Sequence, residues 1–371
     1  MASDTLTQAR VTAEKGSAAA GSRDPFLDNA KFLLVVLVVM GHSWGPLEDR
    51  IRVMKAAYLV VYAFHMPAFV LLCGHLARSF TGRPDQVRKL LTGVLLPYLV
   101  FETVYAGMYT VVWHQPFSIT PTEPRYLTWF LLALFLWRLT VPLWRALRHP
   151  VPVAVLVSLG AGLTSMGYDL ALPRVLMFLP WFVLGMSLRR EHFAPLRTPV
   201  ARWIAVPVLL CACLGAYWAA PRTSGGWLLM QWSGPDMGVP AGTYVVTRLG
   251  LFALAAILTS AFLALVPGRA TVFTALGAVT LYPYLLHGLF VKTVEGSGGY
   301  DVVAAGGLPS AALLTVLAGV LAVLLGSAPV RRAAGPFVEP RLPKWLWSPE
   351  ETPPRAAPGA SEPAPSRQSA R

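Results

Sequence analysis

Charged residues are scarce in this sequence, and acidic ones especially so. Of its 371 residues only 13% are charged and 55% are hydrophobic, whereas soluble domains carry roughly 25% charged residues. Water is therefore not the main solvent of the chain. Apolar stretches recur between residues 31 and 330, each close to the roughly 20 residues that a helix needs to cross a bilayer. The composition predicts an all-α, polytopic membrane protein whose first partner is the lipid bilayer.

Cysteine is also rare, and its placement excludes two kinds of site. The three cysteines, Cys73, Cys211 and Cys213, lie in apolar stretches. They show neither metal-ligand spacing nor a disulfide framework, so we expect packing roles and no metal. A small-residue cleavage site is missing after the first apolar stretch, residues 32–40. We therefore expect that stretch to be a retained helix and not a signal peptide.

Basic residues outnumber acidic ones by 31 to 18, which gives a net charge of +13. They lie in short clusters between apolar segments and form no continuous stripe, which argues against a nucleic-acid partner. Clusters in alternate loops are typical of the positive-inside rule. We therefore predict a multi-pass protein of the cell's inner (plasma) membrane, with an even number of spans and both termini cytoplasmic.

The chain divides into a long membrane domain and two polar ends. Residues 1–25 are rich in Ala, Ser, Thr and charge, and residues 331–371 are rich in Pro. Neither end can bury enough apolar surface to order itself, so we expect disordered cytoplasmic tails. Residues 26–330 should form one transmembrane domain of about ten helices, near 28–45, 56–77, 89–113, 127–147, 151–168, 172–189, 202–219, 244–266, 271–293 and 303–327.

Titratable side chains interrupt four of these apolar segments: His42, His65, Glu102 and His287. A charged residue at the centre of a membrane helix costs about 2.5–3.5 kcal/mol on insertion scales, so each needs a reason. A shared polar site is one reason, and histidine suits it because its ordinary pKa lies near the working pH of a general base. The alternative for each histidine is a hydrogen-bonded core residue.

The first helix carries Lys31 and His42 on one face, because eleven residues make about three helical turns, roughly 16 Å along the axis. Both side chains can line one channel. Asp28 precedes Lys31 by three residues, and an ion pair with a snorkelling lysine at the helix end is the structural alternative for these two residues.

Six stretches, taken in chain order, resemble the acyltransferase 3 family, with the fucose 4-O-acetylase-like proteins as the nearest branch. The resemblance covers residues 24–330. The stretches are Leu27–Lys31 through Gly41-His42-Ser43, Phe64–Pro67 through Gly74, Leu96–Tyr98, Trp129–Leu131, Phe178–Phe182 through Gly185, and Tyr282–Gly288.

The resemblance implies a membrane enzyme that moves an acyl group, by default acetyl, from cytoplasmic acyl-CoA (acetyl-CoA) to a hydroxyl, often on a glycan. Lys31 and His42 match the family's motif of a basic residue, ten residues and a histidine. His42 would be the base and Lys31 would hold the donor or stabilise negative charge, with His65 as a further catalytic candidate. Asp28, Glu102 and His287 are the predicted substrate-binding residues.

The basic second loop is the predicted donor site, because CoA carries phosphates and Arg78, Arg88 and Lys89 can bind them. These residues serve equally as topogenic charges. Two departures from the family pattern lie nearby. Cys73 replaces a serine in the Phe-Phe-x-x-Ser-Gly motif, and Thr92 and Gly93 stand where a further arginine is expected.

Two other functions fit part of the sequence. A proton-coupled transporter or flippase also uses intramembrane titratable residues, although the internal repeat common in transporters is not evident. A membrane scaffold explains the hydropathy but leaves the four titratable residues without a cause. The sugar-containing acceptor stays open among a polysaccharide, a lipid-linked sugar and a glycosylated metabolite.

Overall fold

A computed structural model describes residues 24–343 and 345 of the chain, and every regular element in this part is helical. The expected all-α class is therefore confirmed. The chain divides into a unit that ends at Pro340 and a segment that begins at Arg341, and every helix from α2 to α16 belongs to the first unit. Most of both expected tails lies outside the described residues. The C-terminal tail was predicted to begin at residue 331, but α16 (Ala328–Val338) is helical.

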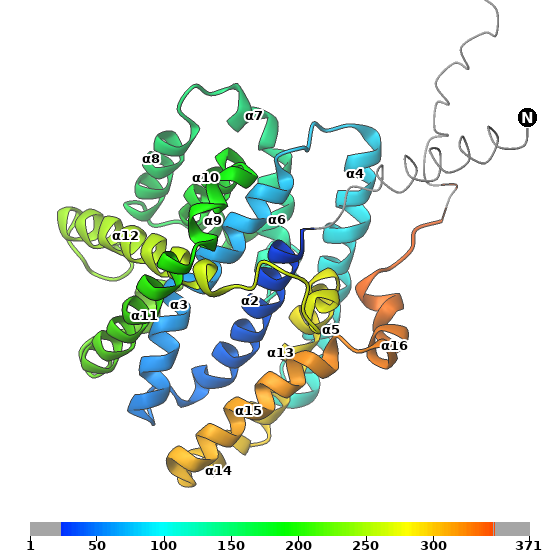
Figure 1. Cartoon of the computed structure of the whole chain (residues 1–371). Coiled ribbons are helices and arrows are strands. Elements are labelled where there is room, and N and C mark those ends of the chain that lie inside the picture. Colours follow the sequence, from blue (N-terminus) through cyan, green and yellow to red (C-terminus); the bar gives the residue numbers. More distant parts are fainter. Residues whose placement is uncertain (1–23, 344, 346–371) are drawn as a thin grey trace, which may run out of the picture. The chain divides into compact units, whose positions relative to one another are not determined.

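Within the described part of the chain, six helices are long and apolar enough to cross a membrane, and Figure 1 shows their arrangement. They are α2 with its 3₁₀ extension (Pro25–Leu47), α3 (Arg52–Ala77), the continuous α4 and α5 (Pro84–Trp113), α11 (Pro199–Ala219), α12 (Ala241–Leu265) and α15 (Gly307–Leu325). A multi-pass membrane protein is thereby supported. About ten spans, and the side on which each terminus lies, stay predictions.

Two of the other expected spans are each divided into two helices, and proline lies at both breaks. The segment expected at 127–147 divides into α6 (Trp129–Leu139) and α7 (Val141–Ala146), and the one at 172–189 divides into α9 (Leu172–Met177) and α10 (Leu179–Ser187). Each second piece has proline in its first turn, where the missing N–H costs least. The α9 and α10 axes differ by 55°. The remaining long elements are α8 (Pro150–Gly162) and α13 (Leu281–Gly296).

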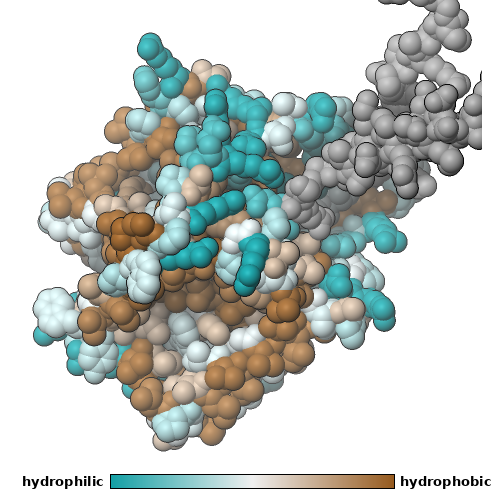
Figure 2. All heavy atoms as spheres, viewed as in Figure 1, coloured by the Kyte–Doolittle hydropathy of each residue, from teal (hydrophilic) through white to brown (hydrophobic). Residues whose placement is uncertain are grey.

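Several of these helices expose more apolar surface than is favourable in water. Only 6% of the most apolar window of α11 is buried, and Trp203 and Leu214 on that helix are 81% and 71% exposed. Figure 2 shows hydrophobic residues over much of the surface and hydrophilic ones gathered toward the upper part of the view. Lipid is the solvent that makes such exposure favourable.

Glycines let the central helices pack backbone to backbone. A Cβ on Gly185 of α10 would lie far inside van der Waals contact of the Leu71 carbonyl of α3, and one on Gly74 of α3 would meet the Phe182 carbonyl of α10. Only glycine allows this approach. The two glycines therefore set the close spacing between α3 and α10. Both belong to stretches that carry the family resemblance.

Candidate active site

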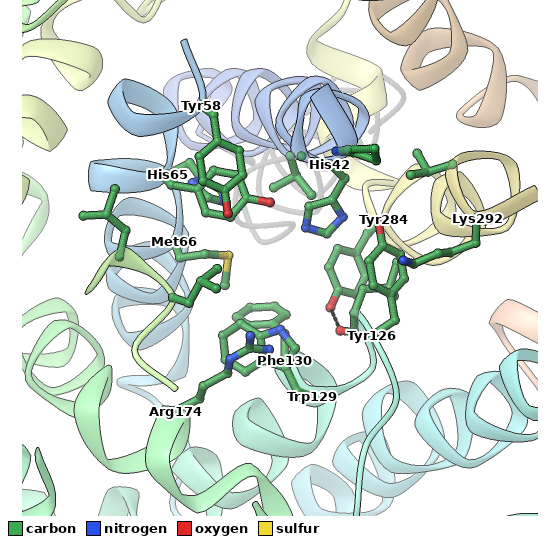
Figure 3. A pocket seen from close by; sticks show the side chains of 18 of the residues that line it. His42, Tyr58, His65, Met66, Tyr126, Trp129, Phe130, Arg174, Tyr284 and Lys292 are labelled. Atoms are coloured by element: carbon green, nitrogen blue, oxygen red, sulfur yellow. Dashed lines mark hydrogen bonds between the residues drawn. The ribbon is translucent and has the colours of Figure 1, made fainter. Parts of the chain in front are cut away.

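The site is a cavity of about 330 Å³ enclosed by α2, α3, α9, α13 and the loop that precedes α6. This volume is at the lower end of the roughly 300–1,000 Å³ typical of ligand pockets. Its wall is mainly aromatic, with a few polar groups that converge on the centre (Figure 3). The aromatic, histidine and charged residues of the wall are His42, Tyr58, Tyr62, His65, Tyr126, Trp129, Phe130, Arg174, Phe178, Tyr284, Lys292 and Glu295.

His42 and His287 form a hydrogen-bonded pair at the wall of this cavity. Nδ1 of His42 lies 2.9 Å from Nε2 of His287, and Nδ1 of His287 lies 2.8 Å from the carbonyl oxygen of Pro283. A carbonyl only accepts, so His287 donates from Nδ1 and its Nε2 must be the acceptor for the Nδ1–H of His42. The hydrogen-bond network thus assigns the tautomers. In the neutral ring the lone pair of His42 is then on Nε2, and the side chain points into the cavity.

His65 also lines the cavity, on α3. Its Nδ1 donates to the carbonyl oxygen of Val61 at 2.8 Å, which leaves its Nε2 as an acceptor. The ring of Tyr62 packs against it with centroids 4.6 Å apart. The structure therefore brings together three of the four titratable residues singled out in the sequence: His42 and His65 in the cavity wall, and His287 directly behind His42.

Glu102 lies away from the cavity that His42 and His65 line. It was expected to contact substrate, but it is fully buried outside the cavity wall. Its carboxylate accepts hydrogen bonds from the guanidinium of Arg125 at 2.7 Å, from the backbone N–H of the same residue at 3.0 Å and from the Thr128 hydroxyl at 2.9 Å. With these bonds made, Glu102 holds the loop that carries Tyr126 over the cavity.

Lys31 and Asp28 lie in a different place from His42. Their side chains pair at 2.7 Å, as the structural alternative predicted. Lys31 lines a second, mostly apolar cavity of about 150 Å³ that also contains Cys73. Phe130 and Tyr284 line both cavities. The motif lysine and the motif histidine are thus separated by two aromatic side chains, and they do not share one open chamber.

The predicted donor residues are only partly brought together. Arg78 lines a third cavity, of about 560 Å³, together with Arg145 and Arg189. Arg88 and Lys89 lie on α4 and are absent from that wall. The basic residues that share this wall with Arg78 are thus Arg145 and Arg189 and not Arg88 and Lys89. A cluster of guanidinium groups suits phosphate.

Two basic residues of the main cavity, Arg174 and Lys292, were not singled out from the sequence. Lys292 pairs with Glu295 at 2.7 Å, and its ammonium lies 4.7 Å from the ring centroid of Tyr126. The rule that singled out His287, a titratable residue in an apolar helix, applies equally to both.

Tyr126 completes the wall near the histidine pair. Its ring lies 5.2 Å from that of His42. Burial raises the pKa of its hydroxyl well above the ordinary value, so it remains protonated and can donate a hydrogen bond. A Cβ on Gly288 would clash with Tyr105 and Tyr126, which explains the glycine next to His287. Within the described part of the chain, no three His, Cys, Asp or Glu residues are grouped to hold a metal ion.

Comparison with known proteins identifies a family for this chain. The model of a family described as acyltransferase domain, Acyl_transf_3, matches residues 24–332, which include all of the helices that form the main cavity. No curated protein and no solved structure matches the chain.

Proposed function

The chain belongs to the acyltransferase 3 family, a family of O-acyltransferase-type membrane enzymes, and on that basis we propose that it moves an acyl group from acyl-CoA to a hydroxyl of a sugar or glycosylated acceptor. Acetyl is the acyl group proposed, with acetyl-CoA as donor. The enzyme would work in the plasma membrane.

The observation that carries this proposal is the hydrogen-bonded chain from His42 through His287 to the Pro283 carbonyl. It directs the Nδ1–H of His42 toward His287, which leaves Nε2 as the nitrogen from which the neutral imidazole can act as a general base. When His42 takes a proton, its Nδ1–H still points at an acceptor, so the imidazolium is stabilised as it forms. The arrangement resembles the way a nucleophile's base is oriented by a third group.

The proposed transfer begins at the acceptor hydroxyl. Nε2 of His42 removes the proton of the acceptor hydroxyl, and the hydroxyl oxygen attacks the thioester carbonyl. The carbon–sulfur bond breaks when the tetrahedral intermediate collapses. The CoA thiolate takes the proton from His42 as it leaves, and the base is restored. Protonated hydroxyls in the cavity wall, such as that of Tyr126, are suited to stabilise the oxyanion of the intermediate.

Lys31 would act on the donor side. It lines the smaller apolar cavity that shares Phe130 and Tyr284 with the main one, so a thioester reaching past these two rings would meet the hydroxyl near His42. The phosphates of CoA would then be bound outside both cavities, where the arginine cluster at Arg78 provides positive charge.

An aromatic wall supports a sugar acceptor. Trp129 and Phe178 stack with ring centroids 5.6 Å apart, and Tyr58 and Tyr62 stack at 3.7 Å. Ring faces offer apolar surface to the C–H face of a sugar, while tyrosine hydroxyls bind its polar groups. The cavity volume allows a small acceptor group rather than a long oligosaccharide.

The test replaces His42 with alanine in the host strain and compares glycans and secondary metabolites by mass spectrometry. We expect loss of one acyl increment from one class of molecule, identical to the loss in a deletion strain. His149→Ala is the matched control, because that histidine is exposed at the start of α8, and it should keep the increment. An unchanged acylation pattern in the His42→Ala strain, with normal amounts of protein in the membrane, would refute the proposal.

A further inference from the structure

Arg174 differs from the other basic residues that line the two neighbouring cavities. Lys31 and Lys292 each have a carboxylate partner at 2.7 Å. Among the residues that the structure describes, no carboxylate lies within salt-bridge distance of Arg174. Its Nη2 donates to Gln231 Oε1 at 2.7 Å, and its Nε–H is buried without a hydrogen-bond partner.

The surroundings of Arg174 stabilise the guanidinium without neutralising it. The charge lies 4.7 Å from the ring centroid of Trp129 and 5.6 Å from that of Tyr168. Cation–π contacts of this kind contribute about 0.5–2 kcal/mol, less than the cost of an unpaired charge inside a membrane protein. The positive charge is therefore largely uncompensated until an anion enters the cavity.

Figure 3 shows Arg174 and His42 pointing into the cavity from opposite sides. We propose that Arg174 forms an anion-binding subsite and that the acceptor carries a carboxylate or phosphate group, which Arg174 binds while the reacting hydroxyl lies at His42. Guanidinium suits either group, because its fork of N–H donors binds two oxygens at once. The inference rests on the proposed function, since it names the acceptor class for that same site.

The anion belongs to the acceptor and not to CoA for a steric reason. The phosphates of CoA are many bonds away from its thioester. A cavity of about 330 Å³ cannot hold both the reacting thioester and those phosphates together with an acceptor hydroxyl. An anion that occupies the cavity at the same time as the hydroxyl is therefore part of the same small molecule.

The test measures ligand-induced thermal stabilisation of the purified full chain in detergent with three sugars. Glucose is neutral, whereas glucuronate and glucose 6-phosphate add a carboxylate or a phosphate at position 6. A charge-assisted bond to Arg174 predicts at least about tenfold tighter binding of one or both anionic sugars than of glucose, seen as a larger rise in Tm at equal concentration. A larger rise in Tm with glucuronate indicates a carboxylate ligand, and a larger rise with glucose 6-phosphate indicates a phosphate ligand.

Two variants tie the effect to this residue. Arg174→Gln should abolish the preference, and Arg174→Lys, which retains a point charge, should keep part of it. Arg148→Gln is the control, because it removes the same charge from an exposed position, and it should leave the preference unchanged. Equal stabilisation by all three sugars in the wild type, or a preference that survives in Arg174→Gln, overturns the proposal.

Acetyl-CoA provides a separate arm. It should stabilise wild type and Arg174→Gln equally if Arg174 serves the acceptor. Loss of the acetyl-CoA effect in Arg174→Gln would assign the residue to the donor and overturn the inference. If acetyl-CoA stabilises neither protein, the donor part of the proposed function fails, while the sugar comparison still decides the anion subsite.

Discussion

Replacing His287 with alanine should slow acyl transfer without weakening acceptor binding. His287 does not line the cavity, so its removal takes away no direct contact with substrate. It does remove the acceptor 2.9 Å from Nδ1 of His42. His42 then loses the partner that selects its tautomer and stabilises its protonated form. The variant should therefore lower kcat and leave KM for the acceptor largely unchanged.

The size of the effect follows from the kind of bond lost. A hydrogen bond to a charged group contributes about 1.5–3 kcal/mol, and each 1.36 kcal/mol changes a rate tenfold. His287→Ala should thus lower kcat by about 10- to 150-fold. His42→Ala removes the base itself and should cost up to about 10⁴-fold. His287→Gln should recover part of the loss, since an amide oxygen can accept from the Nδ1–H of His42.

The assay follows release of the CoA thiol from acetyl-CoA by purified enzyme, with the acceptor identified from the host strain. Protein in detergent must elute as a single folded species for each variant. If kcat of His287→Ala equals that of wild type, or if the whole loss appears in KM, the hydrogen-bonded pair is not part of the chemistry and the mechanism must be rejected.

Three further variants test structural roles through the thermal stability of the protein. Gly185→Ala places a methyl group against a backbone carbonyl of the facing helix and should cost at least about 1–3 kcal/mol, measured as a fall in Tm, whereas Gly215→Ala, which meets nothing, should not. Glu102→Ala leaves Arg125 without its carboxylate and should lower stability by about 3 kcal/mol; an unchanged Tm contradicts the structural role. Hydrogen bonds lower the pKa of Asp236 in the loop between α11 and α12, so its contribution is full above the ordinary Asp pKa and disappears as pH falls through the lowered value. Asp236→Asn should therefore reduce Tm slightly at pH 7, and the difference from wild type should vanish in strong acid.

The separation of Lys31 from His42 shapes the proposed reaction path. The two residues lie on one helix, yet Phe130 and Tyr284 stand between their cavities. Tyr284 donates to the carbonyl oxygen of Leu127, which ties this ring to the loop that Glu102 holds. A donor on the lysine side and an acceptor on the histidine side would thus meet only at the thioester, which keeps the rest of each molecule out of the other's cavity.

Much of the architecture was accessible from hydropathy, because apolar length along a helix is a local property of the chain. The all-helical class, the membrane location and the family all followed from the sequence. The broken helices were harder, since prolines such as Pro142 and Pro180 interrupt segments that are apolar throughout. Hydropathy averages over a window and cannot register the bend between α9 and α10.

Residue chemistry also indicated part of the site. The cost of titratable groups in lipid was enough to single out His42, His65 and His287. The same cost could not tell a cavity residue from a buried structural one, so Glu102 was assigned to substrate although Arg125 and Thr128 occupy its carboxylate. Long-range hydrogen bonds decide that difference, and they join residues whose spacing in the chain carries no pattern.

By itself, the sequence determined that this chain is helical, crosses a membrane and has histidines within its apolar helices. These properties depend on composition and local periodicity. Tertiary structure alone decided that His42 donates to His287, that two aromatic rings separate it from Lys31, and that Arg174 faces the cavity with no carboxylate of the described residues beside it. Each of these facts depends on helices far apart in the chain meeting in one place.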